Sequence, residues 1–377
     1  MLRAKGLVGE SQNEVSNPGW ACVPSTPEDA MPVFTAEQLL EVSQRILRAG
    51  GASEAEAKTV SEVLVGANLA GHDSHGVIRL PQYLNAIKQG HVKPGAKIET
   101  LAEHQAVCVL NGNWGFGQVN ATHGMALACE RARAYGVAAV GIQQSDHVGR
   151  LGHYPLQAAA QGMWGLMMVN GHGGSLLVTP YGGRERRLTT NQLAMAFPTG
   201  TEFPVLIDMT TSVVAEGKVR LKKNLGQPLP EGWCLDAEGN PTTDPDKFYG
   251  PPWGAILPFG GAVAYKGYAL ALAVDILCGA FTGATCSGTS ERRGGNGIFI
   301  LAADISKFQP PEAYAAEVDR FLAWVKSSAP MPGFKEVLIP GEPEFRTEKK
   351  RREEGIPVDE ETWRQIQECG RQLGIEV

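Results

Sequence analysis

The sequence predicts an α/β fold in which helices cover a buried sheet and further helices form the two ends of the chain. Four short apolar runs bounded by Gly, Asn or Asp lie in the middle of the 377-residue chain, as expected of buried strands. Helical patterns alternate with these runs, an order of elements typical of α/β proteins. The predicted strands are residues 106–110, 137–142, 166–169 and 205–207.

Two amphipathic helices are predicted between residues 35 and 70, because apolar residues recur there at helical spacing on either side of Gly50-Gly51. Gly71 is a suitable stop for the second helix. Residues 72–75 form a turn rich in helix-capping residues, and a further helical pattern runs through Ile87. Pro81 either starts that helix or kinks it.

In the middle of the chain, helical patterns at residues 122–134 and 154–161 should cover the sheet. Residues 145–147 and 170–172 follow predicted strands, and ligands usually bind at such strand-end loops. Residues 224–261 are dense in Pro and Gly and too long for a simple connection, so we expect a folded excursion or a lid.

The longest apolar stretch, residues 262–284, is predicted to be a buried helix rather than a membrane span, because Lys266 and Asp275 interrupt it. At the end of the chain, the charge run 348–354 should be a solvated helix, and Asp359 should open a final helix.

The composition excludes several classes of partner. The net charge of -6 and the pI near 5.8 argue against a nucleic-acid groove or an anionic membrane surface, since both need clustered positive charge. The seven cysteines are odd in number and form no CxxC pair, which predicts neither a disulfide framework nor a zinc knuckle. We therefore expect a protein of a reducing compartment, the cytoplasm.

All eight histidines lie between His72 and His172, which points to proton-transfer chemistry in the first half of the chain. If the segment after Ser74 is helical, His75, Arg79 and Tyr83 share one helix face. Arg79 would then clamp a carboxylate beside the acid. The alternative is a capped helix with a surface arginine and a packed tyrosine.

His147 is the second candidate, because it follows a predicted strand and precedes Gly149. Its alternative is a loop histidine bonded to the backbone. Ser74 beside His75 lacks the Gly-x-Ser-x-Gly elbow of a hydrolase nucleophile. The histidines follow no zinc-ligand spacing, and Pro241 occupies the place where a calcium loop needs glycine, so no metal is predicted.

Motifs alone do not reveal a dinucleotide site. Residues 115–120 contain two of the three Rossmann glycines but have Asn120 at the third position. Lys266 at a predicted helix start suits an anion, or it is a lysine that packs its stem on the helix start and extends its ammonium group to solvent. Asp208 ends a predicted strand before Met209 and Thr210, where capping alone would also explain the pattern.

Six segments, in order along the chain, resemble the malate/L-lactate dehydrogenase family, which is distinct from the classical lactate dehydrogenases. The resemblance spans about Phe34 to the C-terminus and leaves the N-terminal extension unmatched. The family includes ureidoglycolate dehydrogenase, diketogulonate reductase, sulfolactate dehydrogenase and piperideine-carboxylate reductase. The segments are GHDSHGVIRLPQY (71–83), HVGRLGHY (147–154), PYGGR (180–184) with Thr190-Asn191, DMTTS (208–212), GNPTTDP (239–245) and YKGY (265–268).

The resemblance implies a non-Rossmann nicotinamide-binding fold, with a mixed seven-stranded sheet wrapped by helices, in a homodimer. It places the acid/base role on Ser74-His75 in some members and on His147 in others, and the substrate-side positions on Arg79 and Tyr83. The implied cofactor is NAD or NADP. The implied cofactor-binding positions are Gly171, His172, Asp208, Met209, Thr210, Lys266, Gly341 and Glu342.

These inferences divide the chain into four segments: a flexible extension (1–30), a helical N-terminal lobe with the acid/base segment (31–105), a cofactor-binding α/β core that includes the excursion 224–261 (106–300), and a C-terminal lobe (301–377). We expect hydride transfer between nicotinamide and a small 2-oxo or 2-hydroxy acid, with His75 as proton donor. The alternatives are a cyclic-imine carboxylate reductase of the same family, a His-metal hydrolase, and a dinucleotide-binding protein without turnover.

Overall fold

The computed structural model describes residues 31–174, 176–288 and 293–377, so the predicted flexible extension 1–30 lies outside the described residues. Its centre is a seven-stranded sheet in the order β2-β3-β4-β11-β5-β6-β7. Strands β3 and β4 pair in parallel and the other neighbours pair antiparallel, which confirms the mixed sheet. The strands are β2 (Glu99–His104), β3 (Val107–Asn111), β4 (Val137–Ser145), β5 (Met163–His172), β6 (Gln192–Phe197), β7 (Val205–Thr210) and β11 (Gly295–Asp304).

All four predicted strands are present, as β3, β4, β5 and β7, but the other three strands of this sheet escaped prediction. Strand β2 is an exposed edge strand with charged residues, so it shows no apolar run. Strand β6 begins with the polar residue Gln192. Strand β11 comes from late in the chain yet inserts between β4 and β5, a pairing on which local sequence carries no information.

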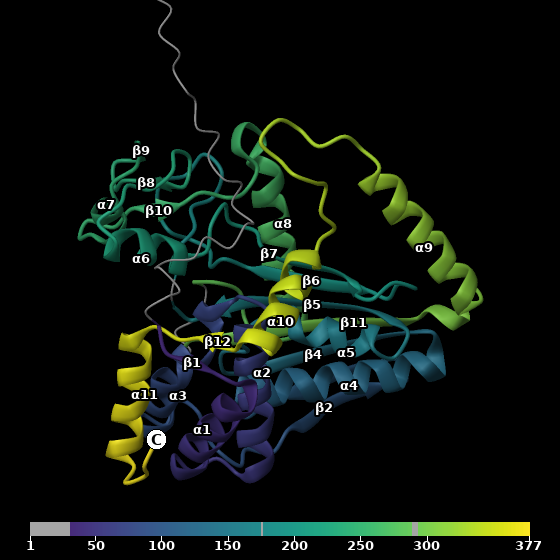
Figure 1. Ribbon diagram of the computed structural model, residues 1–377, viewed down its shortest axis with the longest axis horizontal. Helices are drawn as coiled ribbons and strands as arrows, with labels where there is room; N and C mark the ends of the chain where they lie inside the picture. The colour runs from purple at the N-terminus through teal and green to yellow at the C-terminus, as the bar shows by residue number, and fades with distance from the viewer. Residues whose placement is uncertain (1–30, 175, 289–292) are drawn as a thin grey trace, which may run out of the picture.

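Helices cover both faces of the sheet. Figure 1 shows α4 and α5 on one face and α8 with a smaller sheet on the other. Apolar side chains of α4 and α5 form the main core with the inward side chains of β4, β5 and β11. This arrangement leaves the strand ends open to loops from neighbouring elements. The bounds are α4 (Gly117–Tyr135), α5 (His153–Ala159) and α8 (Tyr265–Asp275).

The N-terminal helices α1 (Ala36–Ala49) and α2 (Glu54–Leu69) confirm the predicted pair, and each begins with a capping box. Helix α3 (Leu80–Lys88) follows two 3₁₀ turns, and Pro81 lies in its first turn, so the proline starts this helix. These helices share one apolar core with residues from the end of the chain.

The C-terminal segment divides among three places. Helix α11 (Glu360–Gln372), capped by Asp359 as predicted, packs against the N-terminal helices, and β12 (Ile356–Pro357) pairs with β1 (Val33–Phe34). Helix α10 (Glu342–Glu354) carries the charge run and borders α2. Helix α9 (Pro311–Lys326) has no buried residue and lies at the right-hand edge of Figure 1.

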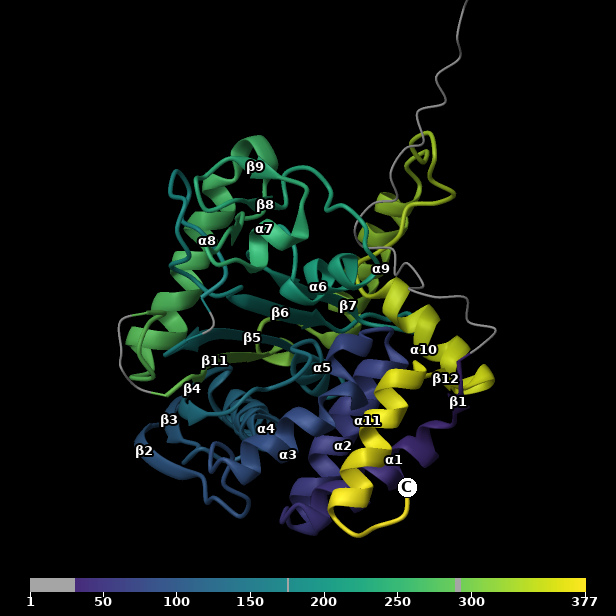
Figure 2. The same cartoon turned by 90° about the vertical axis from the view of Figure 1, so that its left-hand side faces the viewer.

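The proline-rich excursion is folded. It contains a three-stranded sheet in the order β10-β8-β9, formed by β8 (Cys234–Leu235), β9 (Pro241–Thr242) and β10 (Ala255–Ile256), together with α7 (Pro245–Tyr249). Helix α6 (Glu216–Asn224) precedes it, and Figure 2 shows α6 between this small sheet and the N-terminal helices. Apolar residues of the excursion share one cluster with residues of α6, of α8 and of the segments that follow β5 and β7, so the excursion lies beside those strand ends.

The helix predicted to be buried at residues 262–284 is present, but one of its faces is exposed. Helix α8 continues as a π-helical turn, Ile276–Phe281, and Ile276 and Phe281 are 55% and 69% exposed. The hydropathy of a helical segment does not show which of its faces packs against the rest of the protein. None of the helices within the described ranges has the length and apolar character required to cross a membrane.

Asp275, which interrupts this apolar stretch, is buried and holds three segments together. Its two carboxylate oxygens accept hydrogen bonds from the side-chain amides of Asn170 (2.9 Å) and Asn191 (3.0 Å) and from the backbone N–H of Ser287 (2.9 Å). A buried carboxylate is stable only when such donors replace water. Asp275 thus fixes the ends of β5 and β6 against α8.

We expect Asp275→Ala to lower the free energy of unfolding by about 3 kcal/mol, because buried amide and N–H donors lose their acceptor. Urea unfolding followed by tryptophan fluorescence would measure the loss. Glu353→Ala, an exposed site on α10, is the matched control and should change stability by less than about 0.5 kcal/mol. Equal effects of the two substitutions would contradict the role given to Asp275.

Candidate active site

The Ser74-His75 segment is shaped by Asn68, a buried residue at the end of α2. The Asn68 side chain donates to Asp73 Oδ1 (2.6 Å) and accepts from the backbone N–H of Val77 (2.9 Å). A Cβ atom at Gly76 would lie 2.2 Å from Asn68 Oδ1, so only glycine fits there. The Asn68 amide therefore brackets the turn that presents Ser74 and His75.

The continuous helix that would place His75, Arg79 and Tyr83 on one face is not formed. Gly76 adopts an extended conformation (φ -86°, ψ -152°) and separates two 3₁₀ turns, Asp73–His75 and Val77–Arg79. The structure nevertheless brings His75 and Tyr83 to the same place, because each ring lies beside the ring of His147. The ring centroids are 5.8 Å apart for His75 and 6.1 Å apart for Tyr83.

His147 follows β4, at the strand-end loop that the sequence predicts, and its backbone is tightly held. Its N–H donates to Asp146 Oδ1 (2.7 Å), and Asp146 forms an ion pair with Arg293 (3.2 Å). The Arg293 guanidinium in turn lies 4.0 Å from the centroid of the Trp114 ring. A Cβ atom at Gly117 would meet the carbonyl oxygens of this loop at 2.2–2.3 Å, so the start of α4 packs directly against it.

Tyr83 links the helical lobe to this loop. Its hydroxyl oxygen lies 2.9 Å from His147 Nδ1 and accepts a hydrogen bond from Gln118 Nε2 at 2.6 Å. Both Tyr83 and Gln118 are buried. Sequence reasoning missed Gln118, because a single glutamine in the first turn of a helix has no distinguishing pattern.

Burial keeps both imidazoles of the site neutral at pH 7. Desolvation, followed by the positive charge of Arg79, lowers the pKa of His147 to about 3. Desolvation also lowers the pKa of His75 well below its usual value of 6.5, and His147 and Arg79 add to the effect. A neutral imidazole can accept the proton of a substrate hydroxyl.

Arg79 supplies the positive charge of the site. Its Nε donates to the carbonyl oxygen of Ser74 (2.6 Å) and its Nη1 to Gln82 Oε1 (2.7 Å). Burial lowers its pKa, although a guanidinium remains charged at neutral pH. Ser74 Oγ lies 3.1 Å from His75 Nδ1, so the serine contacts the same imidazole. The predicted residues Ser74, His75, Arg79, Tyr83 and His147 thus form one cluster.

Asp208 pairs with Arg150, a residue that the sequence analysis did not select as a candidate. Asp208 Oδ2 accepts from Gly152 N–H (2.8 Å) and lies 3.6 Å from Arg150 Nε. Arg150 is only 7% exposed, and its Nη2 atom makes no hydrogen bond with the described residues. A buried guanidinium with an unused donor fits an anionic or carbonyl group of a bound nucleotide.

The other predicted cofactor positions are distributed more widely. The Gly171 N–H donates to Thr189 Oγ1 (3.0 Å), and His172 is buried beside Trp114. Met209 packs in a small apolar cluster, and Thr210 Oγ1 donates to Ser212 O (3.0 Å). These positions lie at the ends of β5 and β7, on the same sheet as the His147 loop.

Lys266, Gly341 and Glu342 make no contact with the two imidazoles. Lys266 is exposed in the first turn of α8. Gly341 follows Pro340, whose carbonyl accepts from the N–H of Leu206 on β7. The carboxylate of Glu342 is already bound by Lys326 (2.7 Å) and by the N–H of Ile339 (3.0 Å). These contacts indicate that the Glu342 carboxylate stabilises the segment between α9 and α10.

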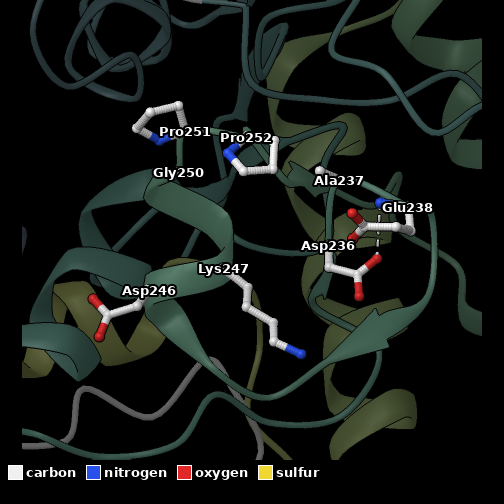
Figure 3. A pocket seen from close by; sticks show the side chains of 8 residues that line it. All are labelled: Asp236, Ala237, Glu238, Asp246, Lys247, Gly250, Pro251 and Pro252. Carbon is white, nitrogen blue, oxygen red and sulfur yellow. Dashed lines mark hydrogen bonds between the residues drawn. The ribbon is translucent and has the colours of Figure 1, made fainter.

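A separate hollow of about 290 Å³ lies in the excursion, away from the imidazoles (Figure 3). Asp236, Glu238 and Lys247 line it. The Asp236 carboxylate accepts from the backbone N–H groups of Glu238 (3.1 Å) and Asn240 (2.8 Å), so it closes its own turn. Nowhere in the described ranges do three or more His, Cys, Asp or Glu side chains form a group that could hold a metal ion.

Taken together, two neutral imidazoles and the half-buried guanidinium of Arg79 lie at the strand ends of the sheet, an arrangement that can exchange a proton with a small anionic substrate. The sequence profile described as malate/L-lactate dehydrogenase matches residues 34–367. Hydroxycarboxylate dehydrogenase B of Escherichia coli K12 is 38% identical over 347 residues, which cover 91% of this chain and 94% of that protein. The chain belongs to the malate/L-lactate dehydrogenase family.

Solved structures agree with this assignment. The sulfolactate dehydrogenase of Methanocaldococcus jannaschii superposes with a TM-score of 0.83 at 36% identity and covers 92% of this chain and 98% of its own. The Δ1-piperideine-2-carboxylate reductase of Pseudomonas syringae pvar. tomato has a TM-score of 0.79 at 28% identity, with coverage of 90% and 99%. The chain is therefore a 2-hydroxyacid dehydrogenase that uses a nicotinamide cofactor, as predicted.

Acid should destabilise the fold through His147 and His153. Desolvation is the main cause that lowers the pKa of His147 to about 3 and that of His153 to about 4. In the unfolded chain both pKa values return to about 6.5, so below that pH the unfolded chain binds more protons than the folded protein. The free energy of unfolding should decrease as pH falls from 6.5 to 4, by up to about 1.4 kcal/mol per pH unit for each histidine.

Urea midpoints measured between pH 7.5 and pH 4 would test this dependence, and His147→Gln should flatten it. His104→Gln, at an exposed histidine, is the control and should leave the slope unchanged. A slope that His147→Gln does not alter would contradict the neutral state of that imidazole.

Proposed function

We propose that His75 exchanges the substrate proton, that Arg79 binds the substrate carboxylate, and that His147 donates a hydrogen bond to the substrate oxygen. The observation that carries this proposal is the stacking of two neutral imidazoles next to one guanidinium. An anionic substrate would be attracted by Arg79, and its reacting oxygen would then face the imidazoles.

In the oxidative direction, His75 would accept the hydroxyl proton of a 2-hydroxy acid while the hydrogen on C2 leaves as hydride and the C–O bond becomes a carbonyl. The nicotinamide, when bound, accepts that hydride. The reverse reaction would return hydride to C2 and the proton from His75 to the oxygen. Arg79 would hold the carboxylate in either direction, and Ser74 would orient the His75 ring through Nδ1.

For the cofactor, we propose that Asp208, Arg150 and the Gly171–His172 segment hold NAD or NADP. The unused donor of Arg150 supports this placement, since it lies next to Asp208 and close enough to His75 to lower the pKa of that imidazole. We retain Met209, Thr210, Lys266, Gly341 and Glu342 as further candidates from the family resemblance.

The substrate class is best supported as a small 2-hydroxy or 2-oxo acid. A cyclic-imine carboxylate is the second candidate, because one structural neighbour is a Δ1-piperideine-2-carboxylate reductase. Both substrates carry a carboxylate for Arg79 and differ only in whether oxygen or nitrogen receives the proton. A panel of 2-oxo acids and cyclic imines, assayed with NADH and NADPH, would separate these candidates and the two cofactors.

On the active member of that panel, His75→Ala should lower kcat by about 10³-fold, because a general acid/base contributes about 10²–10⁴-fold. The dissociation constant of the cofactor, measured by quenching of tryptophan emission, should change by less than about threefold. His104→Ala serves as the control and should retain full activity. A His75→Ala enzyme with near-normal kcat would show that another group moves the proton.

We further propose that the protein is a cytoplasmic homodimer. The cysteines in the part of the chain that the structure describes form no disulfide with one another, which suits a reducing compartment. Helix α9 exposes Phe321 and Trp324, the latter to 76%, and the π-helical turn after α8 exposes Ile276 and Phe281. Apolar side chains exposed on this scale are typical of surfaces that a partner covers.

Phe321→Glu combined with Trp324→Glu should convert the dimer to a monomer, because the charges would be buried at the interface. Light scattering coupled to size-exclusion chromatography would measure the mass. Glu317→Gln on the same helix is the control and should leave the mass unchanged. A wild-type protein that elutes as a monomer at micromolar concentration would contradict the proposal.

A further inference from the structure

Gln118 occupies an unusual position for a polar side chain. It is fully buried in the first turn of α4, and its Nε2 donates to the hydroxyl oxygen of Tyr83, whereas its Oε1 atom has no hydrogen-bond partner among the described residues. An unsatisfied buried amide oxygen costs stability. An apolar side chain would avoid that cost, so the stability of the fold does not explain the glutamine.

The first bond in the chain Gln118–Tyr83–His147 has a fixed direction. An amide nitrogen can only donate, so the Tyr83 oxygen is the acceptor of the 2.6 Å bond. The single phenolic proton is then available for His147 Nδ1, at 2.9 Å. A neutral imidazole that accepts a hydrogen bond at Nδ1 carries its proton on Nε2.

We propose that Gln118 is a positioning residue that acts through Tyr83 to hold His147 in the Nε2–H tautomer. In this tautomer His147 presents a donor to the substrate oxygen and has no free lone pair with which to remove a proton. The proton exchange then belongs to His75. This division of roles rests on the proposed function, whereas the tautomer is a property of the free protein.

The environment of Tyr83 supports a fixed direction. Desolvation raises the pKa of its hydroxyl well above the usual value of 10, so Tyr83 keeps its proton. The low pKa of His147 likewise keeps the ring neutral, so the ring carries a single proton on either Nδ1 or Nε2. Neither group can therefore change its protonation near neutral pH.

His75 has the opposite kind of partner. Its Nδ1 faces the hydroxyl of Ser74 at 3.1 Å, and a serine hydroxyl both donates and accepts. Ser74 is exposed, so its hydroxyl is free to rotate. The His75 ring can therefore take up or release a proton at its other nitrogen while the Nδ1 contact is kept. The His147 imidazole is thus fixed as a donor, whereas the His75 imidazole can both donate and accept a proton.

The ¹⁵N chemical shifts of the imidazole nitrogens of His147 would test the proposal directly. The protein would be labelled with ¹⁵N-histidine, without substrate or cofactor, and the His147 signals would be assigned from their absence in His147→Gln. We expect an unprotonated Nδ1 and a protonated Nε2 at pH 7.5. A protonated Nδ1 would overturn the proposal.

Gln118→Leu tests whether the glutamine is responsible. We expect His147 signals of a mixture of tautomers, a kcat lowered by about tenfold or more, and cofactor binding within about twofold of wild type, because the wrong tautomer presents no donor. Stability should be unchanged or increased, which a purely structural role would not allow. A single Nε2–H signal in Gln118→Leu would overturn the positioning role.

Gln309→Leu, in an exposed turn before α9, is the matched control and should leave the His147 signals and kcat unchanged. If Gln118→Leu does not fold, the wild-type spectrum still decides the tautomer. The proposed function fails separately: the expected tautomer together with a fully active His75→Ala enzyme would refute only the role of His75.

Discussion

The hydrogen bond between Tyr83 and His147 is the constraint on which the site depends, because it links the N-terminal helices to the loop after β4 at the point where the two imidazoles meet. Tyr83 belongs to α3 in the helical lobe, and His147 belongs to the loop after β4. The Asn68 side chain holds the turn that carries His75, and the Tyr83 bond holds α3 beside the same imidazole of His147. The site is thus assembled from two lobes rather than from one motif.

Electrostatics gives the same cluster its chemistry. Burial and the charge of Arg79 disfavour protonation of both imidazoles, so the site holds neutral rings beside a fixed cation. A carboxylate that binds to Arg79 would offset that charge and make protonation of His75 easier at the moment when a proton must be exchanged. Arg150 extends the positive field toward Asp208, where the cofactor is proposed to bind.

The sequence was sufficient for the fold class, the main helices and four of the strands, because these depend on local apolar periodicity. It was insufficient for the features that tertiary contacts determine. The break at Gly76 exists because Asn68 occupies the space of a side chain. The place of strand β11 depends on pairing with β4 and β5, which are distant in sequence. The exposed face at the end of α8 depends on which other elements pack over it, and no local pattern shows this. Gln118 and Arg150 acquire meaning only from the side chains that face them.

A structure of the protein with its nicotinamide cofactor and an unreactive analogue of a 2-oxo acid would test the central claim most directly. The account predicts the analogue carboxylate on the Arg79 guanidinium and the oxygen on C2 within hydrogen-bond distance of both imidazoles, with His147 Nε2 as one donor. An analogue held by a different cation, with its C2 oxygen beyond the reach of His75, would contradict it.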